Sequence, residues 1–330
     1  MHVLIAATVS IIVSILIILT VAMALMLLLK EVETHSMTSM TQLSNSFDYT
    51  TQIDLARQII AENKSFSEAV IFHCYWNGEL NEKHLISVRS CYYFNVMGHI
   101  NRKIILWIES SKSGMYDLEF EKYADVKHFD KSTQEAGTIM HNKKYYMNSA
   151  LSYFSDVVRY ILLLKYGGVW FDLDILFLRP MDPILYKFGN AVCVFQWEHQ
   201  NHPNGALYIS IQPNSPNLQT VVQYIMQRDK GWGFQEANLT YDKPLPLLVL
   251  PCAWADPSWM KNPYGIDFNS VFDKSDVIWT FDNFFPNVFC YHWHNQWKKP
   301  IQSTSIIRQL DNIIIDQLKL KRNAEQVLVA

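Results

Sequence analysis

Asp172 and Asp174 stand inside an otherwise apolar run, GGVWFDLDILFL, at residues 167–178. A buried carboxylate is costly unless it is paired or bound to a metal. Side chains two residues apart on a strand point to the same face, so these two carboxylates are expected to converge. Converging carboxylates at the end of a buried strand suit a hard divalent cation with oxygen ligands. The spacing therefore predicts a metal site at Asp172 and Asp174.

The segment before this run is predicted to be a helix over residues 148–166, ended by Gly167. Asp156 and Arg159 lie three residues apart on it, so they share one face. Taken alone, such a pair is most simply an ion pair on a helix surface. Because this pair directly precedes the two aspartates in the sequence, it favours a site with both an acidic and a cationic group.

Alternating strand and helix patterns surround these residues. Strands are predicted at residues 70–76, 103–108 and 124–129, with helices at 82–95 and 117–123. This order is typical of βαβ units on a parallel sheet, where ligands gather at the carboxyl ends of the strands. Trp76 ends the first strand, so it is either part of the site or a filler of the core.

Composition excludes some other classes of function. The 330 residues carry a net charge of −3, with no evident basic face, so no nucleic-acid partner is expected. The five cysteines show no spacing typical of a metal site. No nearby Ser-His-Asp or Cys-His arrangement offers a competing catalytic centre.

The chain is predicted to contain four segments. Residues 3–29 are uncharged and apolar, long enough to span a bilayer, and indicate a transmembrane signal anchor over residues 1–30. A cleaved signal peptide is the alternative, although its apolar region is usually only about 7–15 residues long. Residues 31–68 are expected to form a polar stem, residues 69–300 a catalytic domain, and residues 301–330 an amphipathic helix and tail.

Three motifs together resemble the DXD sugar-binding region of glycosyltransferase family 32. They are Ser155-Asp156-Val157-Val158-Arg159-Tyr160, the run from Lys165 to Asp174, and Leu178-Arg179-Pro180-Met181. Family 32 includes α-1,6-mannosyltransferases and lactosylceramide α-1,4-galactosyltransferases, and its core is similar to that of the glucosylating clostridial toxins. Weaker similarity extends over most of residues 69–297.

The resemblance implies a fold and an activity. The fold is α/β, a GT-A-like, Rossmann-type mixed sheet flanked by helices and preceded by one transmembrane helix. The activity is a metal-dependent, retaining transfer of a sugar from a UDP- or GDP-sugar donor to a glycan, glycolipid or glycoprotein acceptor. Mn²⁺ is the expected metal, with Mg²⁺ as the alternative. The protein is expected to be a single-pass type II membrane protein with a lumenal catalytic domain, in the Golgi or endoplasmic reticulum of a eukaryote.

The resemblance also implies roles for single residues. Asp174 corresponds to the direct metal ligand, and Asp172 to the carboxylate that holds hydroxyls of the donor and reaches the metal through water. Asp156 and Arg159 match the pair that grips the donor sugar. Trp76 matches the aromatic residue on which the nucleotide base stacks.

The C-terminal run Tyr291-His292-Trp293-His294-Asn295-Gln296-Trp297 matches the segment that covers the diphosphate in the family. His292 is the expected third metal ligand, with His294 as the competing choice, and Trp297 is expected to cover the donor. Gln296 stands where the family has a serine. The alternative is a terminal strand that buries Trp293 and Trp297 in the core.

Two other functions remain open on the sequence. One is a carbohydrate- or nucleotide-binding protein that kept the fold and lost catalysis, which the intact aspartates and Arg159 disfavour. The other is a hydrolase that uses Asp172 and Asp174 as acid and base. Glycosidase carboxylates usually lie on different elements, about 5–10 Å apart across the bond they cleave, so the spacing favours a metal.

Overall fold

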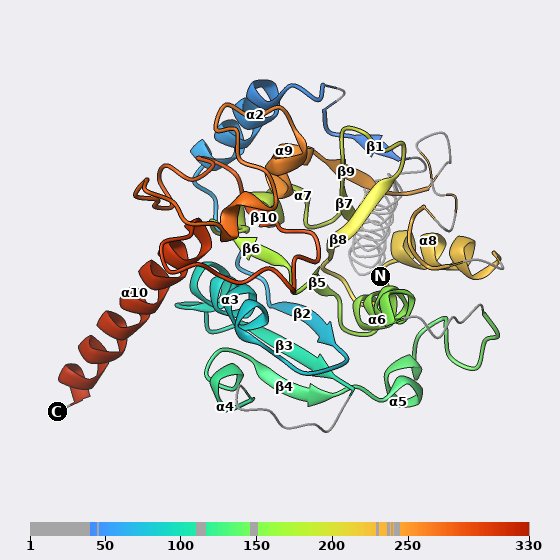
Figure 1. Ribbon diagram of the computed structural model, residues 1–330. Coiled ribbons are helices and arrows are strands. Elements are labelled where there is room, and N and C mark those ends of the chain that lie inside the picture. Colours follow the sequence, from blue (N-terminus) through green and yellow to red (C-terminus); the bar gives the residue numbers. More distant parts are fainter. Residues whose placement is uncertain are drawn as a thin grey trace, which may run out of the picture. The chain divides into compact units, whose positions relative to one another are not determined.

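A mixed sheet forms the centre of the protein (Figure 1). The computed structural model describes residues 40–44, 46–109, 117–145, 151–228, 231–235, 238, 240 and 245–329. In sheet order the strands of this part of the chain are β1 (Thr41–Gln42), β9 (Leu248–Leu250), β7 (Cys193–Gln196), β8 (Pro203–Ser210), β5 (Gly168–Phe171), β2 (Val70–Trp76), β3 (Arg102–Ile108) and β4 (Asp125–His128). Strands β5, β2, β3 and β4 are parallel, whereas β8 runs antiparallel to both of its neighbours. The predicted α/β class with a mixed sheet is confirmed.

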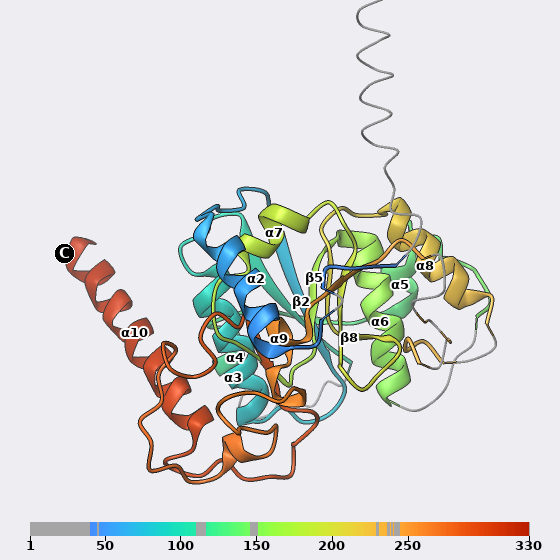
Figure 2. The ribbon, with the colours of Figure 1, turned by 90° about the horizontal axis from the view of Figure 1, so that it is seen from above.

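Helices cover both faces of the sheet (Figure 2). On one side lie α5 (Lys131–Glu135), α6 (Leu151–Tyr166) and α8 (Pro216–Met226). On the other lie α2 (Tyr49–Ala61), α3 (Glu82–Cys91), α4 (Asp117–Phe120), α7 (Asp182–Phe188) and α9 (Cys252–Ala255). Helix α6 is buried almost all round, from Val157 to Leu164, because it packs against β2 and β5. The predicted strands and helices of residues 70–129 are confirmed, except that a π-helix, Tyr92–Val96, continues α3.

The run that holds the two aspartates is not one strand, which corrects the sequence prediction. Strand β5 ends at Phe171, and a turn closes where the N–H of Ile175 donates to the carbonyl of Asp172 at 3.0 Å. The chain then leaves the large sheet as β6 (Ile175–Phe177), which pairs antiparallel with β10 (Cys290–His292). Asp172 and Asp174 therefore belong to a turn between two sheets, and strand alternation does not set their directions.

The predicted polar stem is wrong for residues 40–61, which belong to the folded domain. Strand β1 extends the sheet beside β9, and α2 buries Tyr49, Ile53 and Ile59 at helical spacing. Gln52 fixes this helix from inside: its side chain accepts the N–H of Ala253, and its carbonyl accepts the indole N–H of Trp254 at 2.7 Å. The sequence indicates a possible helix around residues 54–62, and the structure begins it earlier, at Tyr49, and packs it against α9. None of the described helices is both long and apolar enough to cross a membrane, and the predicted anchor, residues 1–30, lies outside the described residues.

The predicted C-terminal amphipathic helix is α10 (Ile306–Val329), which begins against α3 and the short helix Ser270–Phe272. Ile306, Ile307, Leu310, Ile314 and Leu318 are buried along one face. Asp311 is buried on the same helix and accepts two hydrogen bonds from Arg89 of α3, at 2.6 and 2.8 Å. This buried ion pair holds the helix to the domain.

Two glycines carry the chain from α6 into β5 with no room for a side chain. Gly167 has φ +65° and Gly168 has φ +108°, both in the left-handed region. A Cβ on Gly168 would lie 2.1 Å from the carbonyl oxygen of Ile71, and one on Gly167 would lie 2.0 Å from that of Ile211. Ile71 lies on β2 and Ile211 directly follows β8, and the contacting atoms are backbone atoms, so they cannot move aside without disturbing the sheet.

We predict that Gly168→Ala lowers the free energy of unfolding by about 3 kcal/mol or more, because it combines backbone strain with a clash against the sheet. Gly265→Ala is the matched control, since Gly265 has φ +61° but an added Cβ meets no atom within 4 Å. It should lose only about 1 kcal/mol, from backbone strain alone. Urea denaturation of the two variants measures the difference. Equal losses would show that the close approach to Ile71 contributes nothing.

Candidate active site

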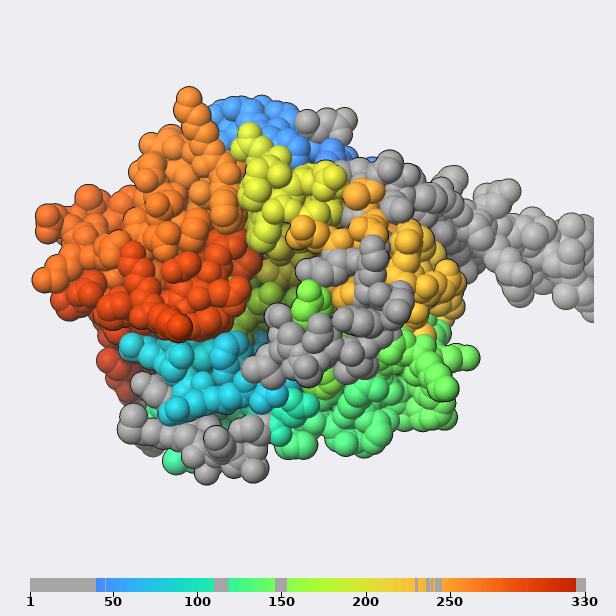
Figure 3. Space-filling model, turned by 45° about the vertical axis from the view of Figure 1, so that its right-hand side comes forward, coloured from blue at the N-terminus to red at the C-terminus, as the bar shows by residue number. Residues whose placement is uncertain are grey.

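A cavity of about 330 Å³ opens at the carboxyl end of β2 and β5. It is lined by Tyr75, Trp76, Asn77, Ser155, Asp156, Arg159, Asp172, Leu173, Asp174, Asn295 and Trp297. The cavity brings together every residue predicted for donor binding, from four separate parts of the chain. Figure 3 looks onto this side of the molecule, where the orange-to-red C-terminal residues meet the cyan residues that follow β2.

Arg159 bridges two carboxylates in the wall of the cavity. Its Nη1 lies 2.7 Å from Asp156 Oδ1, and its Nη2 lies 3.1 Å from Asp172 Oδ1. Arg159 is only 4% exposed, so the interpretation as a surface ion pair is excluded. The guanidinium also lies 5.2 Å from the ring of Trp170, whose indole N–H donates to Asp172 Oδ1 at 2.7 Å. The planar fork fixes the directions of both acidic side chains.

Gly205 of β8 leaves the space that Arg159 fills. A Cβ at this position would lie 2.3 Å from Arg159 Nη1. Only glycine lets the guanidinium pass so close to the strand. The side chain of the neighbouring Asn204 accepts the N–H of Ala206 at 2.7 Å, a local contact within β8.

Asp174 joins the turn after β5 to the C-terminal segment. Its Oδ2 accepts the N–H of Asn295 at 2.7 Å, and its carbonyl accepts the N–H of Trp293 at 3.0 Å. His294 and Asn295 have positive φ angles, +50° and +55°, which bend the backbone around the carboxylate. Burial alone would raise the pKa of Asp174, but the neighbouring His292 and the Asn295 N–H hold that pKa below its usual value.

The pKa of Asp172 is shifted in the opposite direction to that of Asp174. Burial raises the pKa of its carboxyl, the charge of Arg159 opposes that rise, and the nearby Asp174 adds to it. The two carboxylates of the turn therefore differ, since Asp174 is held as an anion and Asp172 is the more readily protonated. A cation between the two carboxylates would strongly reduce the repulsion between them.

His292 on β10 lies beside Asp174, with Nε2 3.2 Å from Oδ2. Two ligands at right angles on a six-coordinate ion, each about 2.1–2.2 Å from it, lie about 3 Å apart, so this pair fits a shared divalent cation. Carboxylate oxygens suit Mn²⁺, and a neutral imidazole is a common metal ligand. Burial lowers the pKa of His292, but Asp174 and Asp256 outweigh that effect and raise it to about 10.

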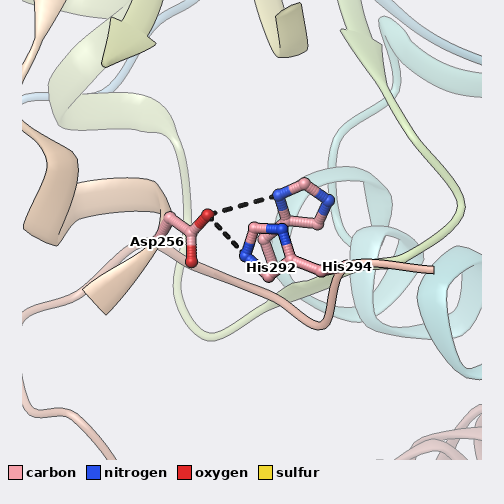
Figure 4. Close-up of side chains that lie close together, drawn as sticks. All are labelled: Asp256, His292 and His294. Carbon is pink, nitrogen blue, oxygen red and sulfur yellow. Dashed lines mark ion pairs between the residues drawn. The ribbon is translucent and has the colours of Figure 1, made fainter. Parts of the chain in front are cut away.

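Asp256, which sequence reasoning missed, completes this group (Figure 4). It follows α9, is fully buried, and lies 3.3 Å from His292 Nδ1 and 2.8 Å from His294 Nε2 through its Oδ2. The atoms that Asp256, His292 and His294 could offer to a metal lie within 4.8 Å of one another. No motif marks Asp256 in the sequence, because its partners come from a distant strand.

Aromatic rings close one end of the cavity. Trp76 and Trp297 lie 5.0 Å apart, and His84 of α3 lies 4.1 Å from the first and 4.4 Å from the second. Both tryptophans are half-buried and line the cavity, so neither is a core filler. This end offers flat apolar faces, whereas the opposite wall is charged.

Each of the two alternatives drawn from the sequence holds for one part of the C-terminal segment. Trp293 is fully buried in the core, as the terminal-strand alternative expects, while Trp297 lines the cavity. Lys83 holds the loop between them through a hydrogen bond to the carbonyl of Gln296, with its ammonium 3.8 Å from the ring centre of Phe272.

Residues 87–188 match the family described as "Glycosyltransferase sugar-binding region containing DXD motif". The match includes Asp156, Arg159, Asp172 and Asp174, so the resemblance drawn from these residues is confirmed. The match supports the predicted class of enzyme, a glycosyltransferase, for the region that carries these residues.

One relative is "Inositol phosphoceramide mannosyltransferase 3" of Schizosaccharomyces pombe, 24% identical over 205 residues, which cover 61% of this chain and 49% of the relative. The chain thus spans about half of that protein's length. Among solved structures, the apo form of the glycosyltransferase GlyE of Streptococcus pneumoniae TIGR4 is 10% identical, covering 77% of this chain and 64% of that one, with a TM-score of 0.46. Mouse xyloside xylosyltransferase 1 is 13% identical over 71% and 99% of the chains, with a TM-score of 0.43. Both TM-scores are below 0.5. The description of the fold therefore rests on the strand order of this chain itself and not on these two structures.

We predict that Arg159→Met destabilises the protein by about 3–5 kcal/mol near pH 7, because it removes the cation between two largely buried carboxylates. The pKa of Asp172, which burial already raises, should then rise further in the folded state above that of the unfolded chain. The folded variant takes up protons first, so its stability should increase as the pH falls toward about 5. Denaturant titrations of wild type and variant at both pH values measure this.

The double variant Arg159→Met/Asp172→Asn is the control for that prediction. It carries one carboxylate fewer, so it should recover part of the loss near neutral pH and depend less on pH. A loss in Arg159→Met that is equal at both pH values would contradict the bridging role.

Proposed function

We propose that the protein is a metal-dependent glycosyltransferase that moves a sugar from a nucleotide-sugar donor to a glycan, glycolipid or glycoprotein acceptor, with retention of anomeric configuration. One observation carries the proposal: a single cavity joins the Arg159 bridge, the paired tryptophans and Asp174, whose carboxylate contacts His292 just outside the cavity lining. The GT-A-like arrangement of the sheet is part of the same proposal.

The cavity suits the two halves of a nucleotide sugar. Trp76 and Trp297 offer ring faces on which a nucleotide base can stack. Asp156 and Asp172 supply acceptors for sugar or ribose hydroxyls, and Arg159 keeps them in place. Trp297 lies over the same end and helps to exclude water, which would otherwise compete with the acceptor.

Asp174 and His292 are the proposed metal ligands, with Asp172 acting through a bridging water. When bound there, a divalent cation neutralises the negative charge that develops on the leaving diphosphate. Mn²⁺ is the proposed ion and Mg²⁺ the alternative. Arg159 adds a permanent positive charge on the other side of Asp172.

The relative's name suggests which donor and acceptor to test first. A mannosyltransferase that acts on inositol phosphoceramide makes GDP-mannose the first donor to test, ahead of the UDP-sugars, and a sphingolipid with an inositol phosphate headgroup the first acceptor. We also propose that residues 1–30 anchor the protein as a type II membrane protein with a lumenal catalytic domain.

We predict that purified protein hydrolyses one nucleotide sugar slowly when Mn²⁺ is present and no acceptor is added. Asp174→Asn keeps the shape of the side chain but removes its charge, so turnover should fall by about 10³-fold or to background. Asp273→Asn is the control, because Asp273 pairs with Lys299 and neither residue lines the cavity. Wild-type turnover that survives EDTA, or full activity of Asp174→Asn, would exclude the metal role; a protein that binds nucleotide sugar without turnover would be a binding protein instead.

We predict that the full-length protein stays in the membrane fraction after alkaline carbonate extraction and retains its N-terminus. The uncharged length of residues 3–29 gives the physical reason, since it can cross a hydrocarbon core of about 30 Å. An N-terminal tag followed by immunoblotting reads the result. Loss of the tag from the mature chain would identify a cleaved signal peptide.

A further inference from the structure

We propose that Asp256 is a positioning residue for the metal centre: its Oδ2 faces Nδ1 of His292 and attracts the proton of the ring to that side, so that Nε2 is the nitrogen presented to the ion beside Asp174. The inference rests on the proposed function, because it assigns how the His292 ligand is oriented. It goes beyond the ligand pair itself, since Asp256 does not line the cavity.

His292 lies between two carboxylates in a buried setting. Nε2 faces Asp174 Oδ2 at 3.2 Å, and Nδ1 faces Asp256 Oδ2 at 3.3 Å. The ring nitrogen toward Asp256 is buried and forms no well-aligned hydrogen bond among the described residues. If Nδ1 carried a lone pair, it would face the lone pairs of a carboxylate, which is repulsive. The same holds for Nε2 beside Asp174, unless a cation lies between them. A neutral His292 that offers its Nε2 lone pair to such an ion must therefore carry its proton on Nδ1, next to Asp256.

Asp256 is itself fixed, as an orienting group must be. Its Oδ2 accepts the indole N–H of Trp197 at 2.6 Å, and its Oδ1 accepts the hydroxyl of Ser258 at 2.9 Å. The residue is 0% exposed. A histidine that ligates a metal usually donates its other N–H to such a carboxylate, which fixes the ring and strengthens the ligand.

The alternative, a metal held by Asp256, His292 and His294 together, fits the geometry less well. The two imidazole rings lie 4.0 Å apart at 31°, and the nitrogen that each directs toward Asp256 meets the same oxygen, Oδ2 (Figure 4). The Nε2 of His294 is already in contact with the indole N–H of Trp259. Asp256 Oδ2 also carries the Trp197 hydrogen bond. Asp256 therefore positions the His292 ring from the Nδ1 side, and Nε2 remains directed at Asp174.

The test is a Mn²⁺ titration of the purified protein without nucleotide, with free Mn²⁺ read by electron paramagnetic resonance. Asp256→Ala should bind Mn²⁺ about 10–100-fold more weakly than wild type. Asp256→Asn should recover part of that affinity, since its amide oxygen can still accept Nδ1–H. The control is Asp182→Asn, which alters another buried carboxylate, paired with Arg102 away from the cavity, and should leave the affinity unchanged.

Two outcomes of the titration would overturn the positioning role. One is wild-type affinity in Asp256→Ala. The other is a loss in His294→Gln as large as that in Asp256→Ala, which would make the three residues the ligand set. If Asp256→Ala does not fold, ¹⁵N-histidine spectra of Mg²⁺-loaded wild type decide: the Nδ1–H tautomer of His292 supports the proposal and the Nε2–H tautomer overturns it.

The same titration separates this inference from the proposed function. A wild type that binds Mn²⁺ and turns over a donor, with Asp256→Ala binding equally well, removes only the positioning role. A wild type that binds no Mn²⁺ overturns the metal-dependent function and this inference together.

Discussion

The site depends on the cost of burying several carboxylates at one end of a sheet. Asp172, Asp174 and Asp256 are each held in or beside apolar surroundings, where an uncompensated charge is unstable. Arg159 compensates on one side and His292 on the other, and backbone N–H groups supply the rest. The arrangement keeps negative charge concentrated next to a cavity, which is the condition for holding a divalent cation.

The fold meets this condition by bringing together distant parts of the chain. The tight Gly167–Gly168 link places the start of β5 beside β2, and the turn after β5 sends β6 away to pair with β10. That pairing delivers His292 and the following loop to Asp174. The Asp174 carboxylate, on the turn after β5, thus fixes the loop that follows β10. That loop in turn forms part of the cavity wall.

Local patterns predicted much of the fold and most of the cavity wall. Helix α6 and strands β2 and β3 carry apolar periodicity that the sequence shows directly, and Arg159 with the aspartates was found by type and spacing. The assumption that Asp172 and Asp174 share one strand was wrong, because the turn after Phe171 is stabilised by pairing with β10. The stem was misassigned because α2 is held by contacts with α9 that no local pattern reveals. Asp256 was missed for the same reason, since its partners Trp197 and His292 come from other elements.

The most direct test of this account is a crystal structure with Mn²⁺ and a nucleoside diphosphate, with anomalous scattering collected at the manganese edge. The account predicts one strong peak bound by Asp174 Oδ2 and His292 Nε2, at about 2.1–2.3 Å from each, with the base against Trp76. A peak between Asp256 and His294, or no peak at the Asp174–His292 pair, would contradict it.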